Sequence, residues 1–467
     1  MGRREREHIE GVKIEAVAAE GKSLAHINGK VLFVPFAVPG DIVDVQVKIK
    51  RKGYMEGYIT KMITPSPLRI DPFCSHYGIC GGCKWQSMPY SVQLQNKQQQ
   101  VSDQLSRIGH LKLPEVSDII GSEETVYYRN KLEYTFSSRR WIESNSEADN
   151  MTEKEKMGVG FHIAGLFDKV IDIKKCYLQP EPTNYIRLFI KDFALKNDIS
   201  FFDLRAQTGL LRTLIIRTST TGEVMVIVVF ARESREIMES LLNALKDKFP
   251  EITSLNWIIN DKKNDSVSDL ECFNYSGKEY INETMEELKF RIGPKSFYQT
   301  NSRQAYRLYS VVREMAALTG KETVYDLYTG TGTIALFLAK YAAKVVGIEY
   351  IADAIEDAGE NARINNIDNA LFFAGDMKDV LSAEFFNDHG APDIIVLDPP
   401  RAGIHPDVAA VIAQSSPLKI IYVSCNPATQ ARDIALIGDN YKIVKVQPVD
   451  MFPHTHHLEN IVLMEKV

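Results

Sequence analysis

Two different hydrophobic patterns divide the chain. Near its start, Val43, Val45 and Val47 alternate with polar residues and predict a strand, and the run 54–60 is typical of its partner strand across a turn. The run 31–34 predicts a further strand. Residues 11–66 therefore predict a small five-stranded, OB-like barrel, with a proline-containing linker at 65–67.

Towards the end of the chain the pattern becomes one of short, continuous apolar runs. From about residue 294 these runs alternate with helical segments, and runs of this kind are typical of strands buried on both faces of a parallel sheet. They predict an α/β, Rossmann-like domain. The expected strands are 323–326, 344–349, 370–373, 394–398 and 419–423, and the expected helices include 333–343 and 351–365.

The middle of the chain, residues 126–290, alternates strands and helices without a phosphate-binding loop, which predicts a mixed α+β domain. Its acidic stretch 143–156 predicts a surface loop, and residues 90–110 have helical spacing. We expect three parts: the barrel at 1–67, a central part at 68–87 and 118–293, and a Rossmann-like part at 88–117 and 294–467.

Composition excludes some classes of protein. With 467 residues, 45 % hydrophobic and 25 % charged, the chain is typical of a multidomain globular protein. It has no run of eighteen apolar residues, and its charged start lacks a signal core, so we expect a cytoplasmic protein with no membrane contact. Nothing in the sequence implies a protein partner, and we expect a monomer. The net charge of −6 argues against a uniformly basic surface but allows a local basic patch.

A glycine loop and three acidic residues predict a cofactor site. Gly330 and Gly332 follow a predicted strand and open a helix, whose free N–H groups suit a nucleotide-like ligand. Glu349 ends the next strand and could accept ribose hydroxyls, and Asp376 could receive an adenine amino group. This order resembles a class I S-adenosylmethionine-dependent methyltransferase. A dinucleotide fold is the rival, but Asp398-Pro399-Pro400 at a strand end favours the methyltransferase.

Cys425 follows the strand after Asp398 and should face the same crevice. A thiol is needed when the methyl acceptor is an unactivated carbon, such as carbon 5 of uracil, because thiolate addition at carbon 6 activates the ring. Glu459 is the candidate base for the carbon 5 proton. The thiolate should have a lowered pKa, with Arg401 as a candidate cation. The alternative for this region is a zinc site built from His454, His456 and His457.

Six cysteines are present, and in a chain without an export signal a cluster indicates metal rather than disulfides. Cys74, Cys80, Cys83 and the distant Cys176 could hold zinc or an iron–sulfur cluster, and their spacing does not choose between them. Cys272 is expected in the core.

Four sequence motifs carry a specific resemblance to a known family. Ser424-Cys425-Asn426-Pro427, Asp398-Pro-Pro-Arg401, Phe297-Tyr-Gln-Thr-Asn301 and His454-Thr-His-His-Leu-Glu459 resemble the RNA uracil-5-methyltransferase family. The resemblance implies nucleophile Cys425, base Glu459 and a [4Fe-4S] cluster on the four cysteines. It implies S-adenosylmethionine contacts from Gln299, Tyr328, Gly330, Gly332, Thr333, Glu349, Asp376 and Asp398, with Thr333 standing where many members have asparagine.

The N-terminal barrel resembles a TRAM domain, an RNA-binding module. Candidate RNA contacts are Lys50, Arg51, Lys52, Tyr54, Arg129 and Lys131. A uracil within structured RNA must leave its stack to reach Cys425, so base flipping is expected. By analogy 23S ribosomal RNA is favoured over transfer RNA. The alternatives are an exocyclic-amine methyltransferase using Asp398 and a non-catalytic RNA-binding iron–sulfur protein.

Overall fold

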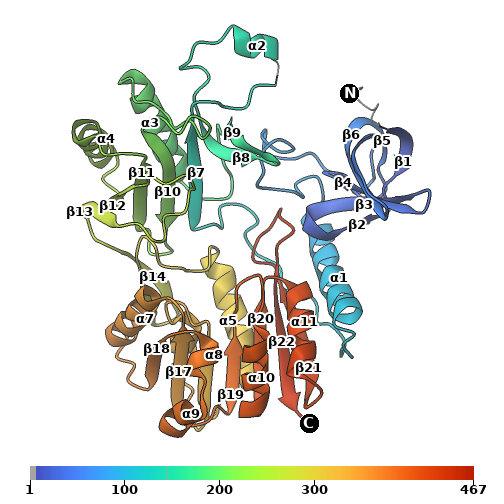
Figure 1. The fold of residues 1–467 in the computed structure, drawn as a ribbon, viewed down its shortest axis with the longest axis vertical. Helices are drawn as coiled ribbons and strands as arrows, with labels where there is room; N and C mark the ends of the chain where they lie inside the picture. The colour runs from blue at the N-terminus through green and yellow to red at the C-terminus, as the bar shows by residue number, and fades with distance from the viewer. Residues whose placement is uncertain (1–6, 144) are drawn as a thin grey trace.

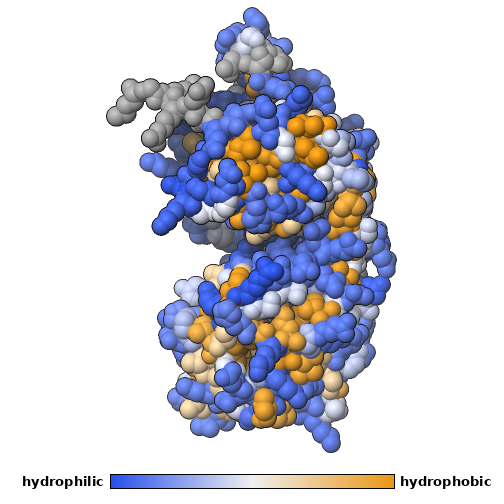
Figure 2. Space-filling view, turned by 90° about the vertical axis from the view of Figure 1, so that its right-hand side faces the viewer, coloured by the Kyte–Doolittle hydropathy of each residue, from blue (hydrophilic) through white to orange (hydrophobic). Residues whose placement is uncertain are grey.

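The computed structural model describes residues 7–143 and 145–467, and its three parts each build a sheet (Figure 1). The charged start of the chain, residues 1–6, lies outside the described residues, as does Ser144 in the predicted acidic loop. No helix in the described part of the chain is both long and apolar enough to cross a membrane. Seen from the side, the molecule narrows between an upper and a lower part, and hydrophilic residues cover much of that face (Figure 2).

The N-terminal part is a curled sheet of six strands in the order β1-β5-β6-β4-β3-β2. The sequence predicts five strands, one fewer than the structure has, and the two-residue β2 is too short for a period-two pattern to reveal. Val43, Val45 and Val47 point into its core as their alternation predicts. The strands are β1 (His8–Lys13), β2 (Ala16–Val17), β3 (Lys22–Ile27), β4 (Lys30–Pro35), β5 (Ile42–Lys50) and β6 (Tyr54–Thr64), with a 3-10 turn at Ala19–Gly21.

The central part is a seven-stranded sheet in the order β13-β12-β11-β10-β7-β8-β9. Its elements are β7 (Lys131–Ser137), α2 (Asn145–Asp149), β8 (Gly158–Ile163), β9 (Leu166–Asp172), α3 (Thr183–Lys196), β10 (Leu211–Thr218), β11 (Val224–Phe230), α4 (Arg235–Lys248), β12 (Ile252–Ile259) and β13 (Cys272–Gly277). Residues 145–156 project from the sheet, and they contain the short helix α2 where the sequence predicts only a loop (Figure 1).

The C-terminal part is a seven-stranded sheet in the order β18-β17-β16-β19-β20-β22-β21. Five strands run parallel, and β22 and β21 close the edge as an antiparallel hairpin. The strands are β16 (Thr323–Leu327), β17 (Lys344–Glu349), β18 (Ala370–Ala374), β19 (Ile394–Leu397), β20 (Lys419–Ser424), β21 (Tyr441–Val449) and β22 (Glu459–Lys466). The hairpin of β14 (Ile281–Met285) and β15 (Leu288–Ile292) lies between this sheet and the central one.

Helices cover both faces of the C-terminal sheet, which explains its continuous apolar runs. Successive residues of one strand, such as Ile420 and Ile421, enter two different cores. The helices are α5 (Ser302–Ala316), α6 (Thr333–Ala339), α7 (Ala352–Ile364), α8 (Met377–Val380), α9 (Ala383–His389), α10 (Pro406–Ser415) and α11 (Pro427–Ile437). Helix α6 is shorter than the predicted 333–343, because residues 340–343 turn back towards β17.

Helix α1 (Tyr90–Ile108) belongs by packing to the C-terminal part, although it precedes the central sheet in the chain. It packs against α11, and its Val101 and Leu105 enter the same core as β19 and β20. The chain therefore visits the C-terminal part twice, which places α1 beside the β21–β22 hairpin.

Candidate active site

The loop after β16 has the backbone shape that a helix N-terminal binding site requires. Tyr328, Gly330 and Gly332 have φ of 67°, 55° and 77°, and Gly332 is the N-cap residue of α6. Asp326 at the end of β16 stabilises the loop. Its Oδ2 accepts hydrogen bonds from the Thr329 hydroxyl at 2.6 Å and from the Ala335 N–H at 3.0 Å. Burial raises the pKa of Asp326 to about 7.

The three predicted acidic residues lie at the carboxyl ends of neighbouring strands. Glu349 ends β17 and accepts the Gly330 N–H at 3.2 Å, so it lies directly against the glycine loop. Asp376 follows β18 and caps α8 through the Lys378 N–H. Asp398 follows β19, half-buried, beside Gln299, and desolvation raises its pKa to about 7.

The remaining predicted cofactor residues border the same loop. Burial raises the pKa of Tyr328 to about 12, and the carboxylates Asp376 and Glu349 add to this shift, so all three groups are neighbours. The buried Thr333 opens α6, and its hydroxyl lies 3.4 Å from that of Thr331. The structure thus brings every predicted cofactor residue to one edge of the sheet.

Cys425 and Glu459 meet at the end of the β20–β22 ladder. The register pairs Ser424 with Asn460, so its next step places Cys425 opposite Glu459. Glu459 is only 4 % exposed. Its Oε2 has no hydrogen-bond partner among the described residues, and burial together with Asp398 raises its pKa well above the usual range.

The expectation of a lowered pKa for Cys425 is wrong for the free protein. Burial and the nearby Glu459 raise the pKa of this half-buried thiol to about 11. Arg401 lies beside the thiol, as predicted, and lowers its pKa, but desolvation is the larger effect. Sequence alone gives the neighbouring charges but not the degree of burial, so it predicts the wrong sign.

The three histidines before Glu459 point to separate partners. His454 Nδ1 lies 3.2 Å from the Gln93 amide, whereas His457 Nδ1 lies 2.9 Å from the Arg401 guanidinium. The ring of His456 packs against that of His457. Within residues 7–143 and 145–467, no group of three His, Cys, Asp or Glu side chains is arranged to hold a metal.

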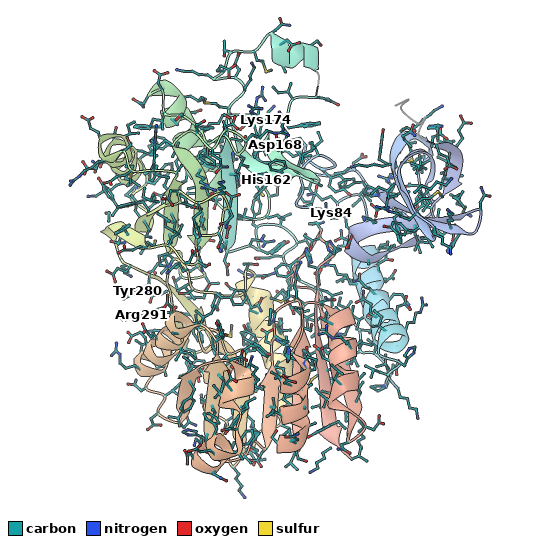
Figure 3. All side chains as sticks on the ribbon, viewed as in Figure 1. Lys84, His162, Asp168, Lys174, Tyr280 and Arg291 are labelled. Atoms are coloured by element: carbon teal, nitrogen blue, oxygen red, sulfur yellow. The ribbon has the colours of Figure 1, made fainter. Side chains whose placement is uncertain are left out.

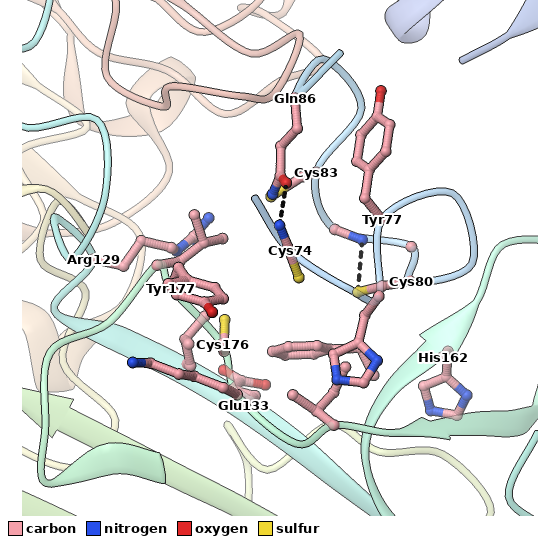
Figure 4. A pocket seen from close by; sticks show the side chains of 18 of the residues that line it. Cys74, Tyr77, Cys80, Cys83, Gln86, Arg129, Glu133, His162, Cys176 and Tyr177 are labelled. Carbon is pink, nitrogen blue, oxygen red and sulfur yellow. Dashed lines mark hydrogen bonds between the residues drawn. The ribbon is translucent and has the colours of Figure 1, made fainter. Parts of the chain in front are cut away.

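The four clustered cysteines line one cavity of about 620 Å³ between the loop 74–86 and the central sheet (Figure 4). Burial raises the pKa of Cys83 to about 12 and of Cys176 to about 11, and raises that of Cys80; neighbouring thiols add to each shift. The Gly82 N–H donates to Cys80 Sγ at 3.4 Å. In the part of the chain that the structure describes, the thiols as they stand do not form a closed metal site. Cys272, expected in the core, is partly buried against it.

The predicted basic residues fall into two groups. Lys50, Arg51 and Lys52 are exposed at the β5–β6 turn, with Lys50 paired to Glu7 at 2.5 Å. Arg129 and Lys131 instead line the cysteine cavity; Arg129 lies 5.4 Å from the ring centroid of Phe452, and Lys131 pairs with Glu133 at 2.6 Å.

Comparison with known proteins gives a consistent result. A family model described as tRNA (Uracil-5-)-methyltransferase matches residues 210–467, more than half of the chain, and a TRAM domain model matches residues 3–60. The chain belongs to the tRNA (uracil-5-)-methyltransferase family. It is therefore a methyltransferase with an N-terminal TRAM domain, as the sequence motifs predict.

Two relatives of this methyltransferase match over nearly their whole length. An uncharacterized RNA methyltransferase of Bacteroides thetaiotaomicron is 56 % identical, covering 96 % of this chain and 100 % of the relative. One of Porphyromonas gingivalis is 54 % identical, covering 97 % and 99 %. The crystal structure of Pyrococcus abyssi tRNA (uracil-54, C5)-methyltransferase in complex with S-adenosyl-L-homocysteine superposes with a TM-score of 0.75 at 29 % identity, covering 98 % of this chain and 100 % of that one.

Sequence reasoning missed two buried groups, one under the glycine loop and one at the base of the β21–β22 hairpin. The motif gives Asp326 no role of its own, although it is the acceptor that holds the glycine loop. The buried pair of Lys97 and Asp450 was missed altogether, because its two residues are 353 positions apart. The sequence signal for the pair is Lys97, a lysine on the apolar face of the predicted helix 90–110.

Proposed function

We propose that this protein transfers a methyl group from S-adenosylmethionine to carbon 5 of a uridine in RNA. The observation that carries the proposal is the juxtaposition of Cys425 and Glu459 at the end of the β20–β22 ladder, close to Asp398. A thiol and a carboxyl at this edge match the two roles that methylation of an unactivated carbon requires.

The glycine loop and its acidic neighbours fit S-adenosylmethionine. Gly332 has no side chain that could cap the first backbone N–H groups of α6, and Glu349 retains oxygen lone pairs for ribose hydroxyls after accepting the Gly330 N–H. Asp376 would accept the adenine amino group. Gln299, Tyr328, Thr333 and Asp398 would complete the binding site. When bound, the cofactor supplies an electrophilic methyl group.

Cys425 and Glu459 act in sequence on the uracil ring. The Cys425 thiolate would form a bond to carbon 6, and the electron pair of the 5,6 double bond would move to carbon 5. Carbon 5 would then take the methyl group as its bond to the sulfonium sulfur breaks, which leaves S-adenosylhomocysteine. Glu459 removes the carbon 5 proton. The electrons of that C–H bond restore the double bond as the bond between Cys425 and carbon 6 breaks, so the thiolate is regenerated.

Both groups must be deprotonated before they act. Burial raises the pKa of Cys425 to about 11, so the free enzyme holds this group as a neutral thiol at pH 7, and burial together with Asp398 raises the pKa of Glu459 well above its usual range. Arg401 lowers the pKa of both groups, and it is the residue that favours their charged forms.

The four-cysteine cavity fits a [4Fe-4S] cluster held by Cys74, Cys80, Cys83 and Cys176. Four thiols face one cavity, burial raises the pKa of Cys83 and Cys176, and such thiols become ligands when a metal centre displaces their protons. Such a cluster would join the loop 74–86 to the central sheet, beside which Cys176 lies. Iron and sulfide analysis of protein purified without oxygen tests this. Cys83→Ala and Cys176→Ala should lose iron, and Cys272→Ala should keep it; zinc in place of iron would contradict the proposal.

The RNA substrate has two candidates. The first is 23S ribosomal RNA, on the combination of a TRAM domain and a cysteine cluster. Transfer RNA is the second, favoured by the Pyrococcus abyssi enzyme, which is named for tRNA uracil-54. Either substrate requires the uracil to leave its stack, because Cys425 lies half-buried. Lys50, Arg51 and Lys52 would bind phosphates, and Arg129 and Lys131 would lie nearer the site.

Nucleoside mass spectrometry tests the function and separates the substrates. RNA from cells that lack the gene should lose one or more 5-methyluridines, in 23S ribosomal RNA for the first candidate or transfer RNA for the second. The purified enzyme should restore the modification to that RNA, and Cys425→Ala should not. If Cys425→Ala keeps most of its activity, methylation of an exocyclic amine beside Asp398 replaces this proposal. Absence of S-adenosylmethionine binding would exclude catalysis altogether.

A further inference from the structure

The loop of residues 450–458 joins β21 to β22 and ends at the candidate base. The hairpin register pairs Val449 with Glu459, so the chain leaves the sheet beside Glu459 and returns to it there. The side chain of Glu459 leaves Oε2 without a partner among the described residues. The position of this carboxyl is therefore set by the backbone around it, and on one side that backbone is the 450–458 loop.

A buried ion pair holds the first residues of this loop. Lys97 Nζ donates to Asp450 Oδ1 at 2.6 Å and to the Phe452 carbonyl at 3.1 Å, and both side chains of the pair are 0 % exposed. Asp450 also accepts the Tyr90 hydroxyl at 2.8 Å and the Phe452 N–H at 2.9 Å. Each of these bonds joins α1 to the loop or the loop to itself.

The tip of the loop is held by the same helix and by the cysteine loop. Gln93 accepts the His454 N–H at 2.9 Å. The His454 carbonyl accepts the N–H groups of Lys84 at 2.8 Å and Trp85 at 3.0 Å, directly after Cys83. Figure 3 shows Lys84 between the N-terminal sheet and the C-terminal part. Helix α1 thus fixes the 450–458 loop at both its start and its tip.

We propose that Lys97 and Asp450 are positioning residues for Glu459. By holding the 450–458 loop on α1, the pair sets the carboxylate where it reaches the carbon 5 proton of the uracil. This inference rests on the proposed function. Within the described residues, the side-chain hydrogen bonds of the pair go to α1 and to the loop, and none goes to Cys425 or the glycine loop. The loop also reaches Arg401 through His457, so loosening it should affect addition of the thiol to a lesser degree than proton removal by Glu459.

The consequence is a change in which step is slow. If the loop loosens, the Cys425–RNA adduct still forms and is still methylated, but the rate of its decay falls because Glu459 is misplaced. The methylated covalent intermediate should then accumulate on RNA that contains ordinary uridine. A residue that served stability alone would lower adduct formation and turnover together.

The test compares covalent complex and turnover in variants of the full-length protein. The double variant Lys97→Met with Asp450→Asn removes the ion pair without leaving one buried charge unpaired. Tyr90→Phe removes a single hydroxyl from the same group and keeps the test available if the double variant does not fold. Arg212→Met is the matched control, because Arg212 is an equally buried cation whose bonds go to residues 260–265 of the central part.

With uridine RNA and S-adenosylmethionine, denaturing gels should show about ten-fold to hundred-fold slower decay of the complex for the double variant, with kcat reduced by the same factor. Tyr90→Phe should show a smaller effect in the same direction, and Arg212→Met none. Parallel loss of complex and turnover, or no change in either, overturns the inference. If the wild-type enzyme itself forms no 5-methyluridine, the proposed function fails instead.

Discussion

Cys425 shows how burial and charge compete at a single residue. Desolvation disfavours the thiolate, and Glu459 disfavours it further, whereas the Arg401 guanidinium stabilises it. The net effect raises the pKa, so Arg401 offsets only part of the cost of burial. The Cys425 side chain of the free protein is therefore held as a thiol.

We expect alkylation to report this balance directly. The rate of iodoacetamide labelling of the Cys425 peptide, followed by mass spectrometry, should rise with pH towards a midpoint near a pKa of about 11 in the free protein. Arg401→Met should move the midpoint higher, because the thiolate loses its neighbouring cation. Arg363→Met, which removes an arginine paired with Glu360, should not. A midpoint below about 8 in the wild-type protein, under the ordinary value of a free thiol, would contradict this role of burial.

Gly332 is a residue where the backbone admits no side chain. Its φ of +77° is left-handed, and a Cβ would lie 3.0 Å from Ala358 Cβ and 3.1 Å from the Phe372 ring. Gly332→Ala should therefore lower the free energy of unfolding by about 1–2 kcal/mol or more and weaken S-adenosylmethionine binding. In helix α7, Gly359 has open space and ordinary φ, so Gly359→Ala should stabilise by up to about 1 kcal/mol. Calorimetric melting and ligand titration compare the two; equal melting temperatures would contradict the argument.

At the scale of elements, the sequence predicts what depends on neighbouring residues. The apolar runs indicate the strands and the parallel sheet, and the motif order places Asp398 and Cys425 at its carboxyl edge. The Lys97–Asp450 pair could not be predicted, because packing of α1 beside the β21–β22 hairpin is a long-range event. The prediction for the pKa of Cys425 failed for the same reason, since burial is decided by elements far apart in the chain.

The start of helix α11 links helix stability to the position of Arg401. Asn426 caps the helix by accepting the Ala428 N–H, and its amide donates to the Arg401 carbonyl at 3.1 Å. Asn426→Ala should lose about 1 kcal/mol of stability and reduce activity. Asn426→Asp keeps the cap but cannot donate, so it should keep the stability and still lose activity. Equal activity of Asn426→Asp and the wild type would show that the hydrogen bond to Arg401 is dispensable.

At the scale of the whole molecule, the three parts meet around the 450–458 loop. Trp85, at the end of the cysteine loop, donates its indole N–H to the Gly21 carbonyl at 3.2 Å and packs with Val38 and Met88, which ties the TRAM domain to the rest. His454 joins the same segment to the C-terminal part. RNA bound by the TRAM domain, as we propose, would thereby lie in a fixed relation to Cys425 and Glu459.

RNA binding should depend on the exposed cations of that domain. Replacing Arg51 and Lys52 by Gln should weaken RNA binding and reduce the slope of log affinity against log salt by about 1 for each phosphate that the variant no longer binds. S-adenosylmethionine affinity should not change. Lys340→Gln, an exposed lysine paired with Glu287 in the C-terminal part, is the control. Fluorescence anisotropy over a salt series measures the slope, and an unchanged slope would remove these residues from the RNA interface.

The central claim is that Cys425 attacks carbon 6 of a uridine, and one measurement tests it most directly. The enzyme is incubated with S-adenosylmethionine and substrate RNA containing 5-fluorouridine, whose fluorine Glu459 cannot remove, and the complex is digested for mass spectrometry. We predict a stable adduct in which the Cys425 peptide carries a methylated 5-fluorouridine nucleotide, absent in Cys425→Ala. RNA that binds and is methylated without any adduct at Cys425 would contradict this mechanism.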